Sequence, residues 1–520
     1  MLLRVLASNI VQKNAYIMPI TDGSHQQAPI LNSVKKLSAR IKKGKLTVLT
    51  VPGHKNSKGV DEELVQLWGR NAINNDTHPL IVMDNLFEPK NEVKEALRLA
   101  TDLYKTKATF FSSSGTSPLV AAMISSVVSR GEKILIPRHA HKSATLGLRL
   151  SGSIPIYVQP EILKERQLPL NNTPEQIEQT LKEHPDIKAV LIVSPTAHGI
   201  HADLEKIEKI VHAAGKILIV DEAWGALMPF CDRYPKSALE VGADVVTQSN
   251  HKDAAAFVGC GLLHLCSDRV SVKQIKRQIG AIMSTSPSMW NLTSQDACRR
   301  YLAYHGYDIA AKAANMGDIA RAEISKIPGF SVIDEKLCSL SGCHSFSPNR
   351  VTVFMDNLGI TGWEIYSMLN KEYGISTMYP SFSNFVAGFS YSNTLEEWGS
   401  LFKALKKISN RYYSKGRSNK WANLKFPSIP PLVLAPAEAT NFEKERSIAL
   451  DESLDKIVAQ TVLAYPPGIP IIVEGEKMTQ EVLEFIKSYV EVGKSEIVKE
   501  TSILMGLEDD NRKISIIDDC

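Results

Sequence analysis

Three stretches of the sequence end in residues whose side chains can do chemistry. The first is FFSSSGTSP, in which small hydroxyl residues surround Gly115 and lead through Pro118 into an apolar helical run. The second is the carboxylate of Asp221, which closes the apolar stretch ILIV. The third is Lys252, which follows SNH. A buried carboxylate needs a cationic or N–H partner, and a lysine amine can bond covalently to an aldehyde.

The first stretch predicts a place for an anion. Proline is favoured at the first helical position, so Pro118 puts the free N–H groups of Gly115, Thr116 and Ser117 at a helix N-terminus, where the helix dipole also attracts a phosphate. Alone, this pattern equally suits a plain Ser/Thr-capped helix, and Asp221 alone equally suits a helix cap or a metal ligand. Pyridoxal phosphate needs all three features together: an anion site for its phosphate, a carboxylate beside its ring nitrogen, and a lysine amine to bond to its aldehyde.

Between about residues 109 and 266, near-continuous apolar stretches alternate with helical patterns. In DLEKIEKIVHAAGK, apolar residues recur at helical spacing, with Asp203 placed to cap the start and Gly215 to end the helix. Apolar strands separated by single helices indicate a mostly parallel sheet buried on both faces, which binds ligands at the carboxyl ends of its strands. The expected strands are 133–138, 154–158, 188–195, 216–223 and 243–249.

The pattern changes after residue 300, where a helical stretch precedes the shorter alternating segments GFSVID, RVTVFMD and GISTMY of a smaller α+β domain. The basic segment 406–421 is interpreted as a solvated helix end running into a linker rather than as a nucleic-acid site. We therefore expect four parts: an N-terminal extension with a helical segment (1–48), a large α/β domain that binds the cofactor (49–310), a small α+β domain (311–425) and a C-terminal domain (426–520).

Composition narrows the class of protein. The 520 residues are 44% hydrophobic and 22% charged with a net charge of +4, which does not single out nucleic acid as a partner. No apolar run reaches the ~18 residues that a membrane helix needs, and MLLRVLASNIVQKNAY is interpreted as a helix or loose extension rather than a signal peptide. Seven scattered cysteines favour a reducing, cytoplasmic compartment. The neighbouring Cys338, Cys343 and His344 lack further ligands for zinc, so no metal is expected.

The sequence resembles the fold-type-I ornithine/lysine/arginine decarboxylases from about Pro29 to Glu476. This resemblance implies an aspartate-aminotransferase-like fold and a pyridoxal-phosphate-dependent decarboxylation of a basic amino acid, feeding polyamine synthesis. It rests on the order and spacing of several motifs, not on any one of them. These motifs are VPGHK (51–55), FFSSSGTS (110–117), PRHAHKS (137–143), IVSPT (192–196), DEAWGA (221–226), QSNHK (248–252), STSPS (284–288), YPPGIP (465–470) and EGE (474–476).

The resemblance also implies a role for each matching residue. Lys252 is expected to form the Schiff base with the cofactor, and Asp221 to pair with the pyridine nitrogen. His141 is expected to stack on one face of the ring and Ala223 to pack on the other. Around the phosphate, the resemblance places Gly115, Thr116, Ser117, Ser249 and His251.

For the substrate's distal cation, family position suggests Glu474 and Glu476, because a buried carboxylate is the expected partner of an ammonium or guanidinium. His54 is a further candidate, although PGHK equally suits a turn and the two glutamates a surface turn. Active sites of this fold type form between subunits, so the resemblance implies a homodimer or a dimer of dimers, with STSPS lent by the neighbour. About fifty residues precede PGHK, too few for the wing domain of longer members, so a short form is expected.

Five positions depart from the family pattern, all around the expected substrate side. The carboxylate of Asp253, next to the lysine, either alters the pKa of that amine or pairs elsewhere. Because the cofactor residues are intact, two alternatives stay open: transamination or oxidative deamination with the same cofactor, or a diverged paralogue that binds the cofactor without turnover. The five departures are Phe87, Ala197, His198, Trp224 and Asp253.

Overall fold

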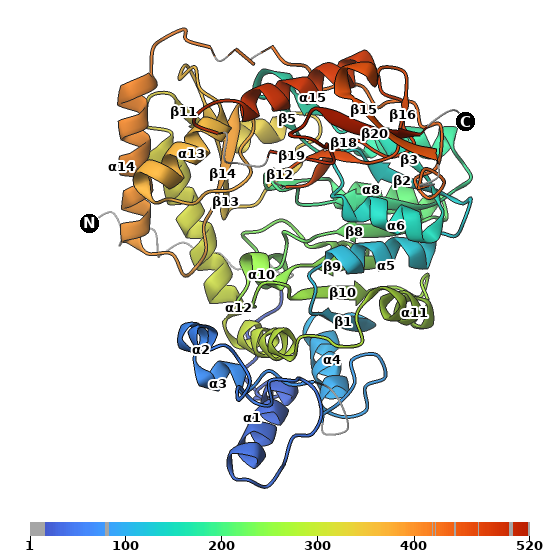
Figure 1. The fold of residues 1–520 in the computed structure, drawn as a ribbon, viewed down its shortest axis with the longest axis vertical. Helices are drawn as coiled ribbons and strands as arrows, with labels where there is room; N and C mark the ends of the chain where they lie inside the picture. The colour runs from blue at the N-terminus through green and yellow to red at the C-terminus, as the bar shows by residue number, and fades with distance from the viewer. Residues whose placement is uncertain are drawn as a thin grey trace.

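A computed structural model describes residues 16–78, 83–418, 420–421, 423–440, 444–465, 467–498 and 503–517. The interpretation of the first sixteen residues therefore falls, but for Tyr16, outside the described part of the chain. Figure 1 shows the large sheet in green and cyan, the small domain in orange at one side, the C-terminal strands in red at the top, and the first helices in blue at the bottom.

A seven-stranded sheet forms the centre of the large domain, in the order β1-β10-β9-β8-β6-β2-β3. In this sheet β10 is antiparallel to both neighbours, and the other strands all run in one direction. Each of the five strands expected from the sequence is present, with its ends within two residues of the prediction. The strands are β1 (Ala108–Ser112), β2 (Lys133–Pro137), β3 (Ile154–Val158), β6 (Ile187–Val193), β8 (Ile217–Asp221), β9 (Val245–Gln248) and β10 (Gly261–Leu265).

Helices bury both faces of this sheet. In β2, Ile134 and Ile136 join the core that contains side chains of α5 and α12, whereas Leu135 joins a second core with α7 and α8. This period of two is what a doubly covered strand requires. As expected, Asp203 caps α8 by accepting a hydrogen bond from the Lys206 N–H. The helices are α4 (Glu92–Leu103), α5 (Ser117–Val127), α6 (Ser143–Ser151), α7 (Pro174–Glu183), α8 (Leu204–Ala213), α9 (Ala238–Val241), α10 (Asn250–Asp253), α11 (Val272–Ile282) and α12 (Met289–Ile324).

The small domain packs α13 and α14 against the antiparallel sheet β11-β13-β14. The alternating segment GISTMY does not form a strand: it makes one isolated bridge, from Met378 to Val386, and Tyr379 then takes a left-handed φ of 46°. The third strand is instead β14, which was not predicted. Helix α12 also runs unbroken through residue 310, where a domain boundary was expected. The elements are β11 (Phe330–Val332), β13 (Arg350–Met355), β14 (Asn384–Gly388), α13 (Gly362–Tyr373) and α14 (Leu395–Tyr412).

The C-terminal part forms two small antiparallel sheets, β15-β20-β16 and β18-β17-β19, packed with α15. Short strands elsewhere pair as β4 with β5 and as β7 with β12. In the described residues, no helix is long and apolar enough to cross a membrane. These elements are β4 (Ile162–Leu163), β5 (Leu168–Pro169), β7 (Ile200–His201), β12 (Ser345–Phe346), β15 (Glu445–Ala449), β16 (Ile457–Val458), β17 (Val462–Ala464), β18 (Ile469–Ile472), β19 (Leu504–Met505), β20 (Lys513–Ile517) and α15 (Gln480–Gly493).

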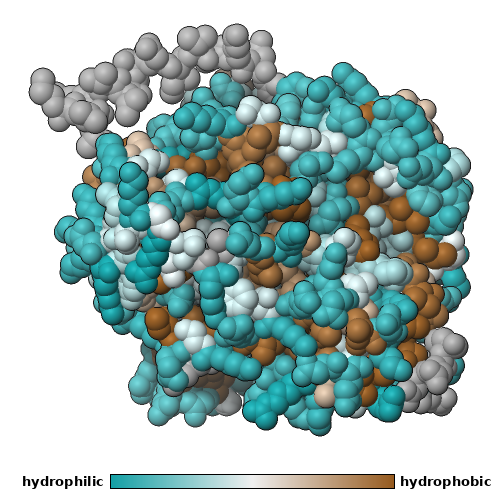
Figure 2. Space-filling view, turned by 90° about the horizontal axis from the view of Figure 1, so that it is seen from above, coloured by the Kyte–Doolittle hydropathy of each residue, from teal (hydrophilic) through white to brown (hydrophobic). Residues whose placement is uncertain are grey.

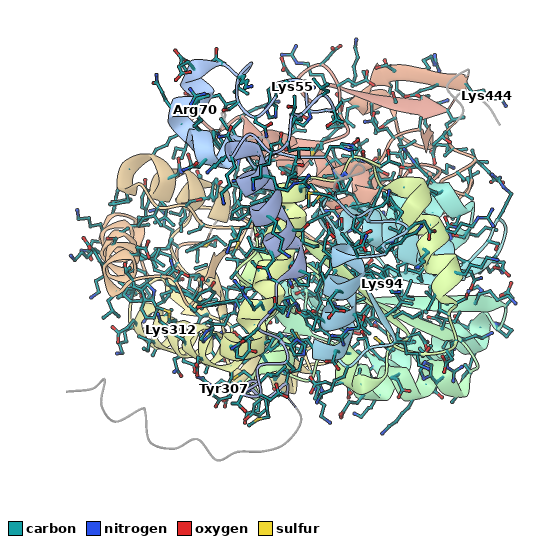
Figure 3. All side chains as sticks on the ribbon, turned by 90° about the horizontal axis from the view of Figure 1, so that it is seen from below. Lys55, Arg70, Lys94, Tyr307, Lys312 and Lys444 are labelled. Atoms are coloured by element: carbon teal, nitrogen blue, oxygen red, sulfur yellow. The ribbon has the colours of Figure 1, made fainter. Side chains whose placement is uncertain are left out.

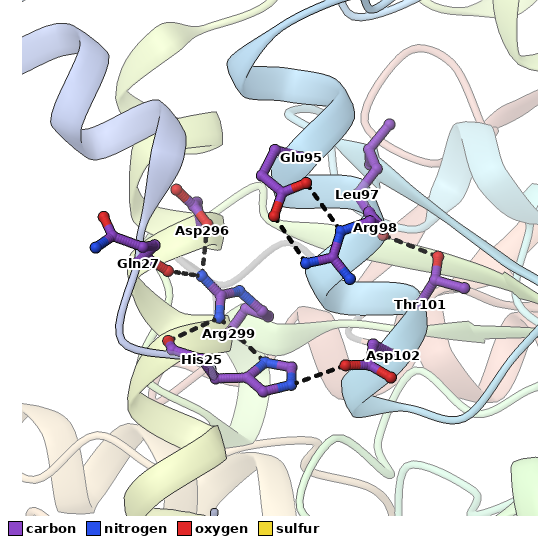
Figure 4. Close-up of polar contacts among 9 residues, drawn as sticks. All are labelled: His25, Gln27, Glu95, Leu97, Arg98, Thr101, Asp102, Asp296 and Arg299. Carbon is purple, nitrogen blue, oxygen red and sulfur yellow. Dashed lines mark hydrogen bonds and ion pairs between the residues drawn. The ribbon is translucent and has the colours of Figure 1, made fainter. Parts of the chain in front are cut away.

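A polar cluster attaches the segment just before helix α1 (Pro29–Lys42) to the large domain (Figure 4), and α2 (Glu62–Trp68) and α3 (Arg70–Ile73) follow later in the chain. Arg299 of α12 donates to the His25 carbonyl at 3.2 Å and to Asp296 Oδ1 at 3.1 Å. His25 Nε2 lies 3.2 Å from Asp102 Oδ2 on α4. These contacts fix the N-terminal segment across two helices of the large domain.

Candidate active site

A cavity of about 450 Å³ lies at the carboxyl ends of β2, β6, β8 and β9. Parallel α/β sheets bind ligands at this edge, as the sequence led us to expect. The walls of the cavity include all nine residues that were expected to hold the cofactor, brought together from segments more than a hundred residues apart. They are Gly115, Thr116, Ser117, His141, Asp221, Ala223, Ser249, His251 and Lys252.

The end of the cavity beside α5 is built for an anion. Thr116 precedes the first residue of α5, and its Oγ1 lies 2.9 Å from Ser249 Oγ. One expectation is corrected here: the Gly115 N–H is not free, because it donates to the Gly259 carbonyl at 2.6 Å. Gly261 allows this close approach of the two segments, since a Cβ there would lie 2.8 Å from the Gly115 backbone. Hydroxyls and the start of an eleven-residue helix therefore converge on one spot.

Lys252 and Asp221 form the reactive part of the cavity. Lys252 lies on the short helix α10, which directly follows β9, and Asp221 is the last residue of β8. Burial lowers the pKa of the Lys252 amine to about 8, although the nearby Asp221 charge acts in the opposite direction. Burial likewise raises the pKa of Asp221, whose Oδ1 accepts a hydrogen bond from the Ala223 N–H at 3.1 Å. A partly neutral amine is a nucleophile, and a buried acid favours a cationic partner.

Two histidines flank these groups. His141 Nδ1 accepts a hydrogen bond from the Ser143 N–H at 3.2 Å, and burial with the Lys252 charge lowers the pKa of His141 to about 4. A backbone loop of the C-terminal domain covers this ring: Gly468 has a φ of +103°, and a Cβ there would lie 3.3 Å from the imidazole. His251 Nδ1 donates to the Cys260 carbonyl at 2.8 Å, and burial lowers the pKa of His251.

Asp253 does not face the cavity but pairs with the small domain. Its Oδ1 accepts a hydrogen bond from Arg350 Nη2 at 2.9 Å, and both side chains are almost fully buried. The Arg350 guanidinium lies 3.9 Å from the centre of the Trp224 ring, and Lys252 Nζ lies 3.9 Å from the same centre. Trp224 in turn meets Tyr379 edge-on at 5.6 Å. We name Lys252, Trp224, Arg350 and Asp253 the lysine clamp, because the small domain contacts the lysine through it.

The glutamates expected to meet the substrate lie elsewhere. Glu476 accepts two hydrogen bonds from Arg138, at 2.6 and 2.8 Å, and Glu474 accepts one from Arg149 Nε at 2.6 Å. Both glutamate side chains are fully buried in these pairs and do not line the cavity, which corrects the expectation. His54 also lies outside it, with its Nε2 3.1 Å from Asp76 Oδ2. The glutamates are instead ion-paired to the large domain.

Sequence reasoning missed several walls of the cavity. His139, Tyr379 and Tyr465 line it, as do three of the departing residues, Ala197, His198 and Trp224. For His139 a signal existed, because it lies two residues before His141 just after the same strand. Tyr379 comes from the small domain, and neither spacing nor composition could connect it to this edge. Phe87, the remaining departure, does not line the cavity.

The cysteines that the structure describes are all free. Cys338 Sγ and Cys343 Sγ lie 3.6 Å apart in the small domain, away from the walls of the cavity. Within the described ranges, no group of three or more His, Cys, Asp or Glu side chains gathers in a geometry for a metal ion.

Comparison with known proteins gives matches over most of the chain. The family model described as "Orn/Lys/Arg decarboxylase, major domain" matches residues 32–357, and that described as "Orn/Lys/Arg decarboxylase, C-terminal domain" matches residues 420–496. An arginine decarboxylase of Halalkalibacterium halodurans is 32% identical over 84% of this chain and 89% of the relative. An arginine decarboxylase of Bacillus subtilis is 30% identical over 90% of this chain and 95% of the relative.

Solved structures agree on the fold. The Francisella novicida lysine decarboxylase LdcF superposes with a TM-score of 0.80 at 20% identity, over 94% of this chain and 81% of the other. The predicted architecture is therefore confirmed: a mostly parallel α/β large domain with a smaller α+β domain and a C-terminal domain.

The fold and the matches define the class of protein, a carboxy-lyase that acts on a basic amino acid. The chain belongs to the Orn/Lys/Arg decarboxylase family, which comprises pyridoxal-phosphate-dependent decarboxylases. The family supports decarboxylation of a basic amino acid, the first interpretation of the sequence, over transamination or oxidative deamination.

Proposed function

We propose that this chain binds pyridoxal phosphate in the 450 Å³ cavity, with Lys252 as its covalent anchor, and uses it to decarboxylate arginine. One observation carries the proposal: Lys252, Asp221 and the Thr116–Ser249 hydroxyl pair line the same cavity. When bound, the cofactor supplies an electron sink for the bonding electrons released with carbon dioxide.

The residues of the cavity fit that group one by one. The start of α5 with Thr116 and Ser249 suits the phosphate, because hydroxyl donors and the helix dipole both favour an anion. Asp221 holds a proton on the ring nitrogen, since a buried carboxylate is stabilised by a cationic N–H beside it. His141, held under Gly468, has its ring fixed and can stack on one face of the cofactor.

The remaining groups orient the substrate and control protons. The Lys252 amine, with its pKa lowered to about 8, is neutral often enough near neutral pH to bond to an aldehyde and later to reclaim it. Burial keeps His141 neutral, so this side chain adds no positive charge beside the amine. The large, small and C-terminal domains each contribute walls to the cavity, so all three can help to orient the substrate over the cofactor.

Arginine is the proposed substrate because the two curated relatives above carry the name arginine decarboxylase. Purified protein with added pyridoxal phosphate is to be offered arginine, lysine and ornithine in turn, with mass spectrometry of the products. We expect carbon dioxide and agmatine from arginine. Release of carbon dioxide from lysine or ornithine in preference to arginine would contradict the choice of substrate.

We further propose that the protein is a homodimer or a dimer of dimers. Apolar side chains are exposed near the N-terminal helices, and two of them, Trp68 and Phe257, line a groove of about 1040 Å³ together with Trp290. Figure 3 views this end of the molecule, with Lys55 and Arg70 labelled, and Figure 2 views the opposite end, where hydrophobic patches lie between hydrophilic residues. A second copy is the expected cover for such a surface. The exposed side chains are Leu49, Val51, Leu64, Leu67, Trp68, Phe257 and Val258.

Sedimentation of the wild-type protein and a Trp68→Glu variant tests this assembly. Dimers in the wild type and monomers in the variant are expected, and a monomeric wild type would contradict the proposal.

A cytoplasmic location, expected from the scattered cysteines, stays a prediction, to be checked by fractionating cells of the source organism.

A further inference from the structure

A second, smaller cavity adjoins the cofactor cavity. It encloses about 110 Å³ where the large, small and C-terminal domains meet. The two cavities share six walls, so a ligand seated in the first can extend into the second: His139, Pro169, His198, Tyr379, Pro467 and Ile469. At ~30 Å³ per water, the smaller cavity holds only a few water molecules or one small polar end group.

Several polar atoms in its walls lack partners among the described residues. Both ring nitrogens of His139, Gln167 Oε1 and Trp363 Nε1 have no hydrogen bond, and each of these three side chains is more than nine-tenths buried. Gln159 Oε1, in a half-buried side chain of the same cavity, is also unpartnered. Because a buried polar group without a partner is costly, such a set indicates a place that a ligand completes.

The orientation of Gln167 is fixed, which makes it an acceptor. Its Nε2 donates to the carbonyls of Trp421 and Leu424, the latter at 3.0 Å. Turning the amide over would set oxygen against two carbonyl oxygens, so Oε1 must face away from them. Burial and the neighbouring His198 lower the pKa of His139 to about 4, so its ring is neutral and offers one lone pair and one N–H.

The kind of group that fits follows from the walls. Aromatic side chains surround the cavity, and among the described residues lining the two cavities Asp221 is the sole carboxylate. Arg138 also lines it, but Glu476 balances this charge. A compact, strongly hydrated ammonium would need a carboxylate, whereas a planar guanidinium is weakly hydrated, stacks on aromatic faces and points several N–H donors at neutral acceptors. The aromatic walls are Trp363, Tyr379, Phe382, Phe426, Phe485 and Tyr489.

We infer that this junction cavity receives the guanidinium end of the substrate, with the side-chain carbonyls of Gln159 and Gln167 and the His139 ring as its hydrogen-bond partners. The inference rests on the proposed function, because the substrate's reacting carbon must lie over the cofactor beside Lys252. The distance from Lys252 to the junction cavity is short. Lys252 Nζ lies 3.9 Å from the centre of the Trp224 ring, and the centres of the Trp224 and Tyr379 rings lie 5.6 Å apart. Tyr379 lines both cavities. Glu474 and Glu476 then take no part in recognising the substrate.

Calorimetric titration of the cofactor-loaded protein tests the inference, with agmatine as the guanidinium probe and cadaverine as the ammonium probe. We expect agmatine to bind more tightly than cadaverine. Gln167→Leu should weaken the binding of agmatine about ten- to hundredfold and raise the KM for arginine by a similar factor, because it removes a hydrogen bond to a charged group. The visible absorbance of the cofactor should stay unchanged. Gln295→Leu, which removes another fully buried glutamine on α12, is the matched control and should leave both constants unchanged.

Unchanged agmatine binding and arginine KM in Gln167→Leu would overturn the inference. If that variant does not fold, Ala464→Leu, which fills the cavity from β17, replaces it: loss of agmatine binding with retained cofactor absorbance supports the inference, and retained binding overturns it. The proposed function fails separately, if the wild-type protein with pyridoxal phosphate decarboxylates no basic amino acid. If the wild-type protein decarboxylates arginine but these substitutions leave agmatine binding and the KM for arginine unchanged, only the inference about the junction cavity is refuted.

Discussion

The lysine clamp predicts opposite effects from two substitutions. Asp253→Asn removes a negative charge beside Lys252, and Arg350→Gln removes a positive one. The loss of Asp253 should lower the pKa of the Lys252 amine below its wild-type value of about 8, and the loss of Arg350 should raise it. Only the neutral amine bonds to an aldehyde, so attachment of the cofactor at Lys252 grows as pH rises through that pKa.

The Asp253–Arg350 ion pair also contributes to the stability of the folded protein, so its loss should lower the free energy of unfolding. Arg350 is 1% exposed and its Nε and Nη1 have no partner among the described residues, so Asp253 balances an almost fully buried charge. Removing one member of such a pair typically costs about 3–5 kcal/mol, because the other stays buried and unpaired. Asp253→Asn should therefore show a markedly lower denaturation midpoint than the wild type. Asp356→Asn breaks the more exposed pair with Arg166, which joins the same two domains, and should cost less.

The assay is borohydride trapping of pyridoxal phosphate on cofactor-free protein from neutral to alkaline pH, with mass spectrometry to locate the tag. The pH midpoint of trapping should fall in Asp253→Asn, rise in Arg350→Gln and stay constant in Asp356→Asn. A change that merely loosened the site would shift the first two midpoints in the same direction. Equal midpoints, or a common shift, would refute the electrostatic reasoning.

Three further experiments test the site. Lys252→Ala should lose the visible absorbance of attached cofactor and nearly all turnover, whereas Lys142→Ala, the other lysine that lines the cavity, should keep the absorbance; the reverse result would reassign the anchor. Asp221→Ala should retain some cofactor but decarboxylate at least about a hundredfold more slowly, measured as carbon dioxide release, and equal rates would count against a role at the ring nitrogen. Thr116→Val with Ser249→Ala should raise the Kd for pyridoxal phosphate about tenfold or more in equilibrium titration without moving the anchor, and an unchanged Kd would place the phosphate elsewhere.

The sequence predicted what depends on local pattern. Apolar stretches gave the parallel strands, and the motifs at their ends named the nine residues that meet in the cavity. Strands β1 and β10 were not among the expected strands, and the antiparallel direction of β10 could not be predicted, because a continuously apolar strand has the same pattern in a parallel and an antiparallel pair. The partners of the buried charges could not be predicted from the sequence either: Asp253 pairs with Arg350, and Glu476 pairs with Arg138 of the large domain. Such pairs are set by the packing of whole domains, which spacing along one segment does not encode.

The glutamates paired with Arg138 and Arg149 limit how this chain can be recombined. Each carboxylate sits inside the C-terminal part, while its counter-charge comes from the large domain, where Arg138 follows β2 and Arg149 lies on α6. A C-terminal part produced alone, or grafted onto a relative without arginines at both places, would carry two uncompensated charges at its docking face. Chimaeras of related enzymes should therefore assemble only when the arginine and the glutamate of each ion pair come from the same parent. These two ion pairs thus determine which large domains and C-terminal parts can be combined.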